Sequence, residues 1–412
     1  MAQPMGRRFW AVWAGSSASY LAEGLLFGAL PVLAASLTRD ARLISITDAL
    51  NQIGWLLLGL ASGVAADRLP RLRIMWMANA LRAVTAGIFA GLVAAGDASL
   101  PLVYGLGFLL GLAAPFFDNA SSSVLPELVA PGHFQRANSL TQMAMALSAN
   151  LLGPVIGTAT YALWPAAPFG FAAVAYAAGS LITGTVSRRD PGRPAHTGDA
   201  SNRELLKDGL SYLLHHRPLR TLATAVGVVN FVTSGAIAVL VLYVLQLLHL
   251  PESAYGLVMA SFAVGALVGA VLTVRLTRTI GERTSVVAAL VAFGLAMLVL
   301  AAFPLAAVSF AAFVVVGFFS MVWNITVNSY RQRVVPIDLL GRVTSVYRML
   351  AFLTMPLGAL GAGLVAHAIG LQWTYAAGGV LLLVTGALSV RPLRGMPNFP
   401  DAEAETEAVT TP

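Results

Sequence analysis

Long apolar stretches alternate with short polar segments along the whole of this 412-residue chain. Each stretch has about 20 residues or more, the length of helix that crosses the hydrocarbon core of a bilayer. We identify twelve of them: residues 9–37, 47–66, 74–95, 100–122, 140–163, 168–187, 219–248, 254–274, 285–304, 305–329, 343–368 and 371–390. The pattern therefore predicts an all-α membrane protein with twelve transmembrane helices.

The composition agrees with this prediction. Only 10% of the residues are charged and the mean hydropathy is +0.78, whereas a soluble domain carries roughly 25% charged residues. So few charges cannot cover a soluble surface. The chain has no cysteine, which excludes disulfides and thiolate chemistry.

The basic residues predict the orientation. With the N-terminus in the cytoplasm, 21 of the 25 Lys and Arg residues fall in cytoplasmic segments, counting Arg220 at the cytoplasmic end of the seventh span. Two (Arg39 and Arg42) fall outside, and two (Arg82 and Arg348) fall deeper within spans. This bias is the one that sets membrane topology. We therefore expect both termini on the cytoplasmic side of the cell's inner (plasma) membrane. The same bias explains the net charge of +7 without a nucleic-acid partner.

The chain divides into two halves. Residues 1–187 are expected to form an N-terminal six-helix bundle and residues 219–390 a C-terminal one. Between them, residues 188–218 form a polar cytoplasmic linker with a short amphipathic helix expected on the inner membrane surface. The linker is either a regulatory element or a tether, and the tether is favoured. The acidic segment 391–412 has no apolar periodicity, so it is predicted to be a disordered cytoplasmic tail.

The halves resemble each other at an offset near 205 residues. Four pairs of positions match at this spacing: Gly63 with Gly269, Asn119 with Asn324, Pro131 with Pro336, and Gly153 with Gly358. A parallel pseudo-repeat of two six-helix bundles is a transporter architecture, in which the substrate site lies near the bilayer midplane between the repeats.

Two motifs carry a resemblance to a known family. The pattern Gly63-x-x-x-Asp67-Arg68-x-x-Arg71 resembles the motif between the second and third helices of the major facilitator superfamily. Gly153-Pro154-x-x-Gly157 resembles the core of that superfamily's antiporter motif. Two longer stretches, 117–157 and 324–363, are similar to its drug and siderophore exporter branch. The resemblance covers residues 9–390 and implies a secondary active transporter that exports its substrate.

The resemblance also implies a set of gating residues. Asp67, Arg71 and Asp118 would form a charged latch at the cytoplasmic side, with Gly63 and Arg68 in the same loop. The chain departs from the pattern of this superfamily at two positions. Gly107 occupies the position of the fourth-span arginine typical of proton-coupled members, and Thr273 occupies the position that matches Asp67 in the second half.

Glu23 is the strongest candidate for a proton- or substrate-binding residue. It lies near the middle of the first span, where a charge costs several kcal/mol unless it is paired or neutralised. Such a carboxyl group could load and release a proton as access alternates. Tyr20 and Phe27, at i−3 and i+4, share its helix face and could stack on a ligand. The alternative is a structural glutamate that forms hydrogen bonds inside the bundle.

Other polar residues within the spans are weaker candidates. Asn51 and Trp55 share a face and could line an outer vestibule, or they could anchor the helix at the interface. Asn150, Asn230 and Asn328 could bind substrate or a neighbouring helix. For Arg82, pairing with an acid or snorkelling to the inner surface is favoured over ligand contact.

Several classes of chemistry are excluded by motif. The single lysine, Lys207, follows no Gly-x-x-x-x-Gly pattern, so the chain has no phosphate-binding loop for ATP. No hydrolase or metalloprotease motif is present, and we expect no cofactor, no metal site and no enzymatic activity.

The sequence therefore predicts a monomeric transporter for proton-coupled efflux of a small amphipathic compound such as a drug, siderophore or secondary metabolite. One alternative is a lipid or lysolipid flippase of the same fold. Another, from a different class, is a receptor or scaffold that does not transport.

Overall fold

The computed structural model describes residues 5–188 and 202–396. Its regular elements are all helices, with no strand in these two ranges. Among the described residues, eleven helices are long and apolar enough to cross a membrane, and α2 (Ala41–Arg68) adds a twelfth if its two arms, which meet at 52°, count as one span. The prediction of an all-α protein with twelve membrane helices is confirmed.

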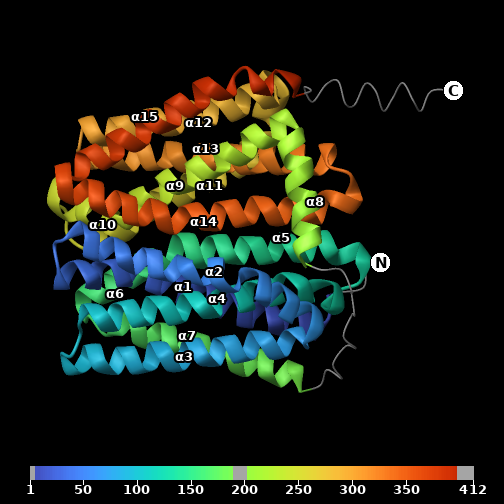
Figure 1. Cartoon of the computed structure of the whole chain (residues 1–412). Coiled ribbons are helices and arrows are strands. Elements are labelled where there is room, and N and C mark those ends of the chain that lie inside the picture. Colours follow the sequence, from blue (N-terminus) through green and yellow to red (C-terminus); the bar gives the residue numbers. More distant parts are fainter. Residues whose placement is uncertain (1–4, 189–201, 397–412) are drawn as a thin grey trace. The chain divides into compact units, whose positions relative to one another are not determined.

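The first compact unit of the chain contains residues of the range 1–198 together with 238–260. Besides α2, its long helices are α1 (Arg7–Leu37), α3 (Arg71–Ala95), α4 (Leu100–Leu128), the continuous α5–η2–α6 (Phe134–Met145, Ala146–Leu152 and Gly153–Leu163) and α7 (Ala167–Ser187), with a short turn η1 (Pro131–His133). Figure 1 shows these helices running alongside one another, with α2 packed on α4, α3 on α7, and α1 on both α6 and α7.

The second compact unit contains residues 199–237 and 261–412 in the part that the structure describes. Its elements are α8 (Asn202–His215), α9 (Arg217–Ala238), most of α11 (Ser253–Ile280), α12 (Glu282–Ala302), α13 (Ala306–Val334), α14 (Ile337–Ile369), α15 (Leu371–Ser389) and η4 (Pro392–Gly395). The short helices α10 (Leu240–Leu242) and η3 (Tyr243–Leu247) belong to the first unit. The division of the chain at 187 and 219 stays a prediction.

The helices extend beyond several of the predicted apolar spans because they continue into charged residues at their ends. The second helix runs on to Arg68, α3 starts at Arg71, and α13 continues through Arg331 and Arg333. Glycines stop or start three helices with a backbone that other residues rarely adopt, and one of them is Gly96 with φ of 84° after α3.

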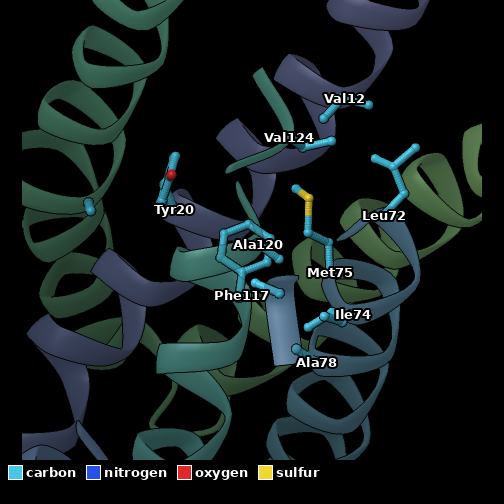
Figure 2. Packing of buried hydrophobic residues seen from close by; sticks show 11 residues of the cluster. Val12, Tyr20, Leu72, Ile74, Met75, Ala78, Phe117, Ala120 and Val124 are labelled. Carbon is cyan, nitrogen blue, oxygen red and sulfur yellow. The ribbon is translucent and has the colours of Figure 1, made fainter. Parts of the chain in front are cut away.

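The core of the first unit is an apolar cluster shared by five helices. Figure 2 shows how Met75 from α3 and Phe117 and Val124 from α4 pack beside Val12 and Tyr20 from α1. The residues in this cluster are almost completely buried. This packing fixes α1, α3 and α4 against one another and sets the positions of their polar side chains.

One crossing in this unit brings two backbones into contact. Gly24 in α1 lies directly against Gly153, and Gly157 lies against the carbonyl group of Leu25, so an added Cβ at any of these glycines would meet backbone atoms. Just before the crossing, η2 is a π-helical turn. Pro154 lacks an N–H and cannot continue a regular α-helical ladder, and π-helical turns often occur at functional sites.

The linker and tail are described only in part. Residues 189–201 and 397–412, which include part of the predicted linker and most of the predicted disordered tail, lie outside the described residues. In the described part, α8 forms where the sequence predicts a helix and packs on α14, and its Tyr212 hydroxyl donates to the carbonyl of Val334 at 3.1 Å. Residues 392–395 form a short 3₁₀ turn.

Candidate functional site

A buried arginine stands at the centre of the first unit. Arg82, in the middle of α3, is only 2% exposed. Its guanidinium group therefore does not snorkel to the membrane surface. Because an arginine remains charged inside a protein, the site around it must supply compensating negative charge.

Glu23 supplies part of that charge. Its Oε2 lies 3.9 Å from Nη1 of Arg82, and the glutamate side chain is 43% exposed. The ion pair therefore joins a partly exposed carboxylate to a buried guanidinium group. Glu23 also directly precedes Gly24, so it lies at the level where α1 crosses the π-helical turn.

Two aromatic rings hold the guanidinium group. Arg82 Cζ lies 5.4 Å from the ring centre of Phe117 on α4 and 5.4 Å from that of Tyr176 on α7. Such cation–π contacts stabilise a desolvated charge by up to about 2 kcal/mol. Tyr20 extends the aromatic group, since its ring meets Phe117 edge to face at 5.9 Å (Figure 2).

A second acidic residue follows Phe117 directly on α4. Asp118, next to Phe117 on α4, interacts electrostatically with Arg82 and with Tyr20. The Tyr20 hydroxyl lies 3.5 Å from Ser121 Oγ one turn further along α4. The site therefore combines two acids, one arginine and two tyrosines from four helices. We call Glu23, Arg82, Asp118, Tyr20 and Tyr176 the Arg82 site.

A buried asparagine on α3 connects this helix to α1. Asn79, one helical turn before Arg82, donates from Nδ2 to Ser19 Oγ at 2.8 Å, and Ser19 donates to the carbonyl of Gly15. Gly179 of α7 closes on the same pair. These contacts fix the rotation of α3 against α1, and with it the direction in which Arg82 points.

Charged groups of this kind can exchange a proton or bind a charged ligand. A partly exposed carboxylate that pairs with a buried cation can lose the pair when it is protonated, which links proton uptake to a rearrangement of charge. In the described residues no group of three His, Asp or Glu side chains could hold a metal ion.

The second predicted site lies where α2 ends and α3 begins, and its Arg71 pairs with a residue outside the expected set. Arg71 pairs with Glu127 near the end of α4, and its Nε donates to the carbonyl of Ala66 at 3.2 Å. Asp67 and Arg68 are exposed, and Gly63 has open space around it. The structure thus gives Arg71 a carboxylate partner that the sequence analysis did not single out.

The remaining candidates lie apart from the Arg82 site or in the second unit. Phe27 is 40% exposed on α1. Asn51 donates to the carbonyl of Gly107 at 3.4 Å, which ties α2 to α4, and Trp55 is half-buried one turn later. Asn150 is exposed within the π-helical turn.

In the second unit, two predicted asparagines bond within their own helices. Asn230 donates to the carbonyl of Val226 at 2.9 Å, and Asn328 accepts from Arg331 at 2.6 Å. Neither bond leaves its helix, so these asparagines are candidates only through their remaining polar atoms. Gly153, Pro154 and Gly157 are buried against α1, as described above.

Comparison with known proteins gives a consistent family match. A family model described as "Major Facilitator Superfamily" matches residues 12–353 and 222–411. The chain is 29% identical over 410 residues to "Multidrug efflux pump Tap" of Mycobacterium tuberculosis, covering 93% of both chains. It is 21% identical over 385 residues to "Macrolide efflux protein A" of Streptococcus pyogenes, covering 91% of this chain and 93% of that protein.

A solved structure shares the fold. The crystal structure of a bacterial homologue of the iron transporter ferroportin, in an inward-facing state, superimposes with a TM-score of 0.75 over 95% of this chain and 100% of that one, at 18% identity. At this identity the likeness concerns the fold alone.

Proposed function

Since this chain belongs to the Major Facilitator Superfamily and is a multi-pass membrane transporter rather than an enzyme, we propose that it exports a small amphipathic compound in exchange for protons. Glu23, a member of the Arg82 site, is the proposed proton carrier. The observation that carries this proposal is the ion pair between half-exposed Glu23 and fully buried Arg82 in the middle of the spans.

The direction of transport is supported by the relatives. Two of them are named as efflux proteins, for several drugs in one case and for macrolides in the other, and the match extends over nearly the whole of each chain. A small amphipathic molecule is therefore the proposed substrate class. A drug, a siderophore and a secondary metabolite all remain within it.

Proton coupling is supported by the distribution of acids. Three acidic residues lie inside the twelve predicted spans, namely Glu23, Asp48 and Asp118, and all three belong to the first half. An ionisable residue at membrane depth is expensive, so its presence is by default a sign of function. Two of these three acids interact with Arg82.

The proposed cycle uses these groups in order. A proton from outside binds to the carboxylate of Glu23 and competes with substrate there. Release of that proton to the cytoplasm restores the carboxylate for the next substrate. Rocking of residues 1–187 against 219–390 would alternate access. Gly63, Asp67, Arg68 and Arg71, at the end of α2 and the start of α3, would gate the cytoplasmic side.

The location follows from the sequence. We place the chain in the inner (plasma) membrane with both termini in the cytoplasm, on the bias of its basic residues. We also propose that it acts as a monomer.

Export can be tested in cells that lack their own major efflux pumps. Cells that express the chain are loaded with ethidium or with erythromycin, a macrolide, and retention is followed with and without an uncoupler. We expect expressing cells to lose at least one compound several times faster than vector controls, and the uncoupler to abolish the difference.

The alternatives give different results in the same cells. A flippase would leave retention of both compounds unchanged but would move a fluorescent lysolipid between leaflets. A receptor or scaffold would do neither, and that outcome would refute the proposed function.

A further inference from the structure

We infer that a cavity in the second unit, enclosed by α9, α12, α14 and α15, binds an acyl chain of a membrane lipid. Such a site goes beyond the proposed function. It depends on the membrane-spanning helices of this unit and not on proton coupling or on the exported compound.

The cavity has a volume of about 150 Å³. Each of the four helices contributes to its wall, with Val232 from α9, Met297 from α12, Gly361 from α14 and Ala377 from α15 among the lining residues. Half of the lining residues are glycine or alanine, so the space exists because these positions carry little or no side chain. Protein interiors are otherwise close-packed, and empty space is destabilising, so an apolar occupant would stabilise this unit.

A tight helix crossing keeps the cavity open. Gly358 of α14 lies against the carbonyl group of Phe231 on α9, and Gly235 of α9 lies against the carbonyl group of Gly358. A Cβ added at either glycine would meet backbone atoms. Because the two backbones already touch here, α9 and α14 cannot move closer together to fill the cavity.

The cavity offers water few hydrogen-bond partners. Thr374 and Tyr375 carry the polar side chains among its lining residues. Both hydroxyls are used within the protein, since Thr374 donates to the carbonyl of Ala362 at 3.4 Å and Tyr375 to that of Ala236 at 3.0 Å. A buried water needs about two to four polar partners, whereas a dry apolar cavity of about this size in another protein binds benzene or xenon. The expected occupant is therefore apolar.

The mouth of the cavity lies between α14 and α15. Val232 and Met297 at its back are buried, whereas Leu381 of α15, which also lines it, is 39% exposed. Leu360 and Leu364, beside the mouth on α14, are exposed as well. The cavity therefore opens onto an apolar surface of membrane-spanning helices, which is the kind of surface that lipid tails cover.

The depth of the cavity matches one leaflet of a bilayer. Helix α14 ends at Ile369, and the lining residues Val365 and Gly358 precede this end by about one and three turns. At about 5.4 Å per turn they lie about 5 and 16 Å from the helix end. One leaflet contributes about half of a hydrocarbon core that is about 30 Å thick. The cavity thus lies at the depth of acyl chains, in the outer leaflet for the proposed orientation.

These features favour a lipid over the exported compound. Trp373, in the first turn of α15, is 60% exposed, as is typical of aromatic residues at the head-group level. A lipid can place one chain in the cavity while its head group stays in water at this level. An amphipathic compound within the cavity would instead bury its polar part beside hydroxyls that are already bonded.

Photolabelling in liposomes tests this site. The purified full-length chain is reconstituted in phosphatidylethanolamine and phosphatidylglycerol with a trace of phosphatidylcholine that carries a diazirine in the middle of one acyl chain. Labelled peptides are identified by mass spectrometry after illumination. We expect labels to concentrate around Gly361 and Ala377, several-fold above another exposed apolar helix face such as that around Val84 of α3.

Two variants fill the cavity from opposite walls. Ala377→Leu on α15 and Val365→Phe on α14 place apolar atoms where the acyl chain would lie, so labelling at the cavity should fall several-fold in each. Ala387→Leu makes the same change at an exposed position of α15 that does not line the cavity, and no change is expected for this matched control. The apparent Tm in detergent checks folding, and cavity filling should keep or raise it.

Even labelling of all exposed apolar helix faces in the wild-type chain overturns the inference, and this result needs no variant. Cavity labels that persist in the folded variants with a filled cavity also overturn it. If the compound that is exported in cells displaces the label from the cavity alone, the occupant is that compound and not a lipid. A chain that exports nothing but shows the cavity labels refutes the proposed function and leaves this inference standing.

Discussion

Glu23 and Arg82 show how two charged residues become tolerable inside a membrane protein. Each alone would cost several kcal/mol at this depth. Together they form an ion pair that two aromatic rings cover and that a second acid supports. The residues of the site are therefore spread over four helices. The buried arginine accounts for the acids and the aromatic rings around it, because they stabilise its charge.

Glu23 could be predicted from the sequence, because a lone acid in the middle of an apolar span is visible there. The position of Arg82 in a span was visible as well, together with the expectation that it would either pair with an acid or snorkel. The pairing of Arg82 with Glu23 and the contacts of Tyr176 and Asn79 could not be predicted, because nothing in the sequence says which face of α3 meets α1 and α7. For the same reason, Glu127 could not be predicted as the partner of Arg71.

The pair of Arg71 and Glu127 offers a prediction on stability. Both side chains are mostly buried, at 21% exposure each, so loss of one charge leaves the other poorly solvated. We expect Glu127→Gln to lower stability by about 1–3 kcal/mol and to lower the apparent Tm of the purified protein by several degrees. The double exchange Arg71→Glu with Glu127→Arg should recover most of the loss, whereas equal melting of Glu127→Gln and wild type would contradict a stabilising pair.

At the scale of helices, the sequence predicted the number and approximate extent of the spans because apolar length is a direct physical requirement of the bilayer. It did not predict the bend of 52° in α2 or the π-helical turn η2. The π-helical turn depends on how the chain before Pro154 satisfies its backbone groups, and on the tight crossing with α1 that follows.

The glycines at that crossing give a prediction with an internal control. An alanine at position 157 would bring Cβ into the backbone of Leu25, whereas Gly91 in α3 has open space around it. Overpacking costs about 1–3 kcal/mol, and an alanine in an open helical position gains about 0.5–1 kcal/mol. We therefore expect Gly157→Ala to lower the apparent Tm and export, and Gly91→Ala to keep or raise the Tm.

The opposite ranking of these two variants by thermal unfolding would show that the close approach of α1 and α6 does not stabilise the unit. Loss of export in Gly157→Ala at unchanged Tm would place the role of the crossing in movement instead.

At the scale of the whole molecule, the two compact units have different chemistry. The acids inside the predicted spans lie in the first half, and the second-half spans contain none. Glu282, at the start of α12, is completely buried and pairs with Arg333 of α13. This pair joins the first turn of α12 to the last turn of α13, just as Arg71 and Glu127 join α3 to α4, with the charges exchanged. The pseudo-repeat thus extends to an ion pair at equivalent helix ends in each half, while proton binding is proposed for the first half alone.

The orientation in the membrane has its own test. The natural chain has no cysteine, so single cysteines can be introduced without background. In intact cells we expect a membrane-impermeant maleimide to label Ser99→Cys, between α3 and α4, and not Ser211→Cys in α8 until the cells are permeabilised. The reverse pattern would place both termini outside.

The claim that export is coupled to protons through Glu23 is tested most directly in liposomes that contain the purified chain and a pH-sensitive dye. With whichever of ethidium or erythromycin is exported in cells, we predict that wild type and the exposed-loop control Asp97→Asn move protons when the compound is added, and that Glu23→Gln reduces this flux at least tenfold. A Glu23→Gln protein that transports the compound with the same proton flux as wild type would contradict the account.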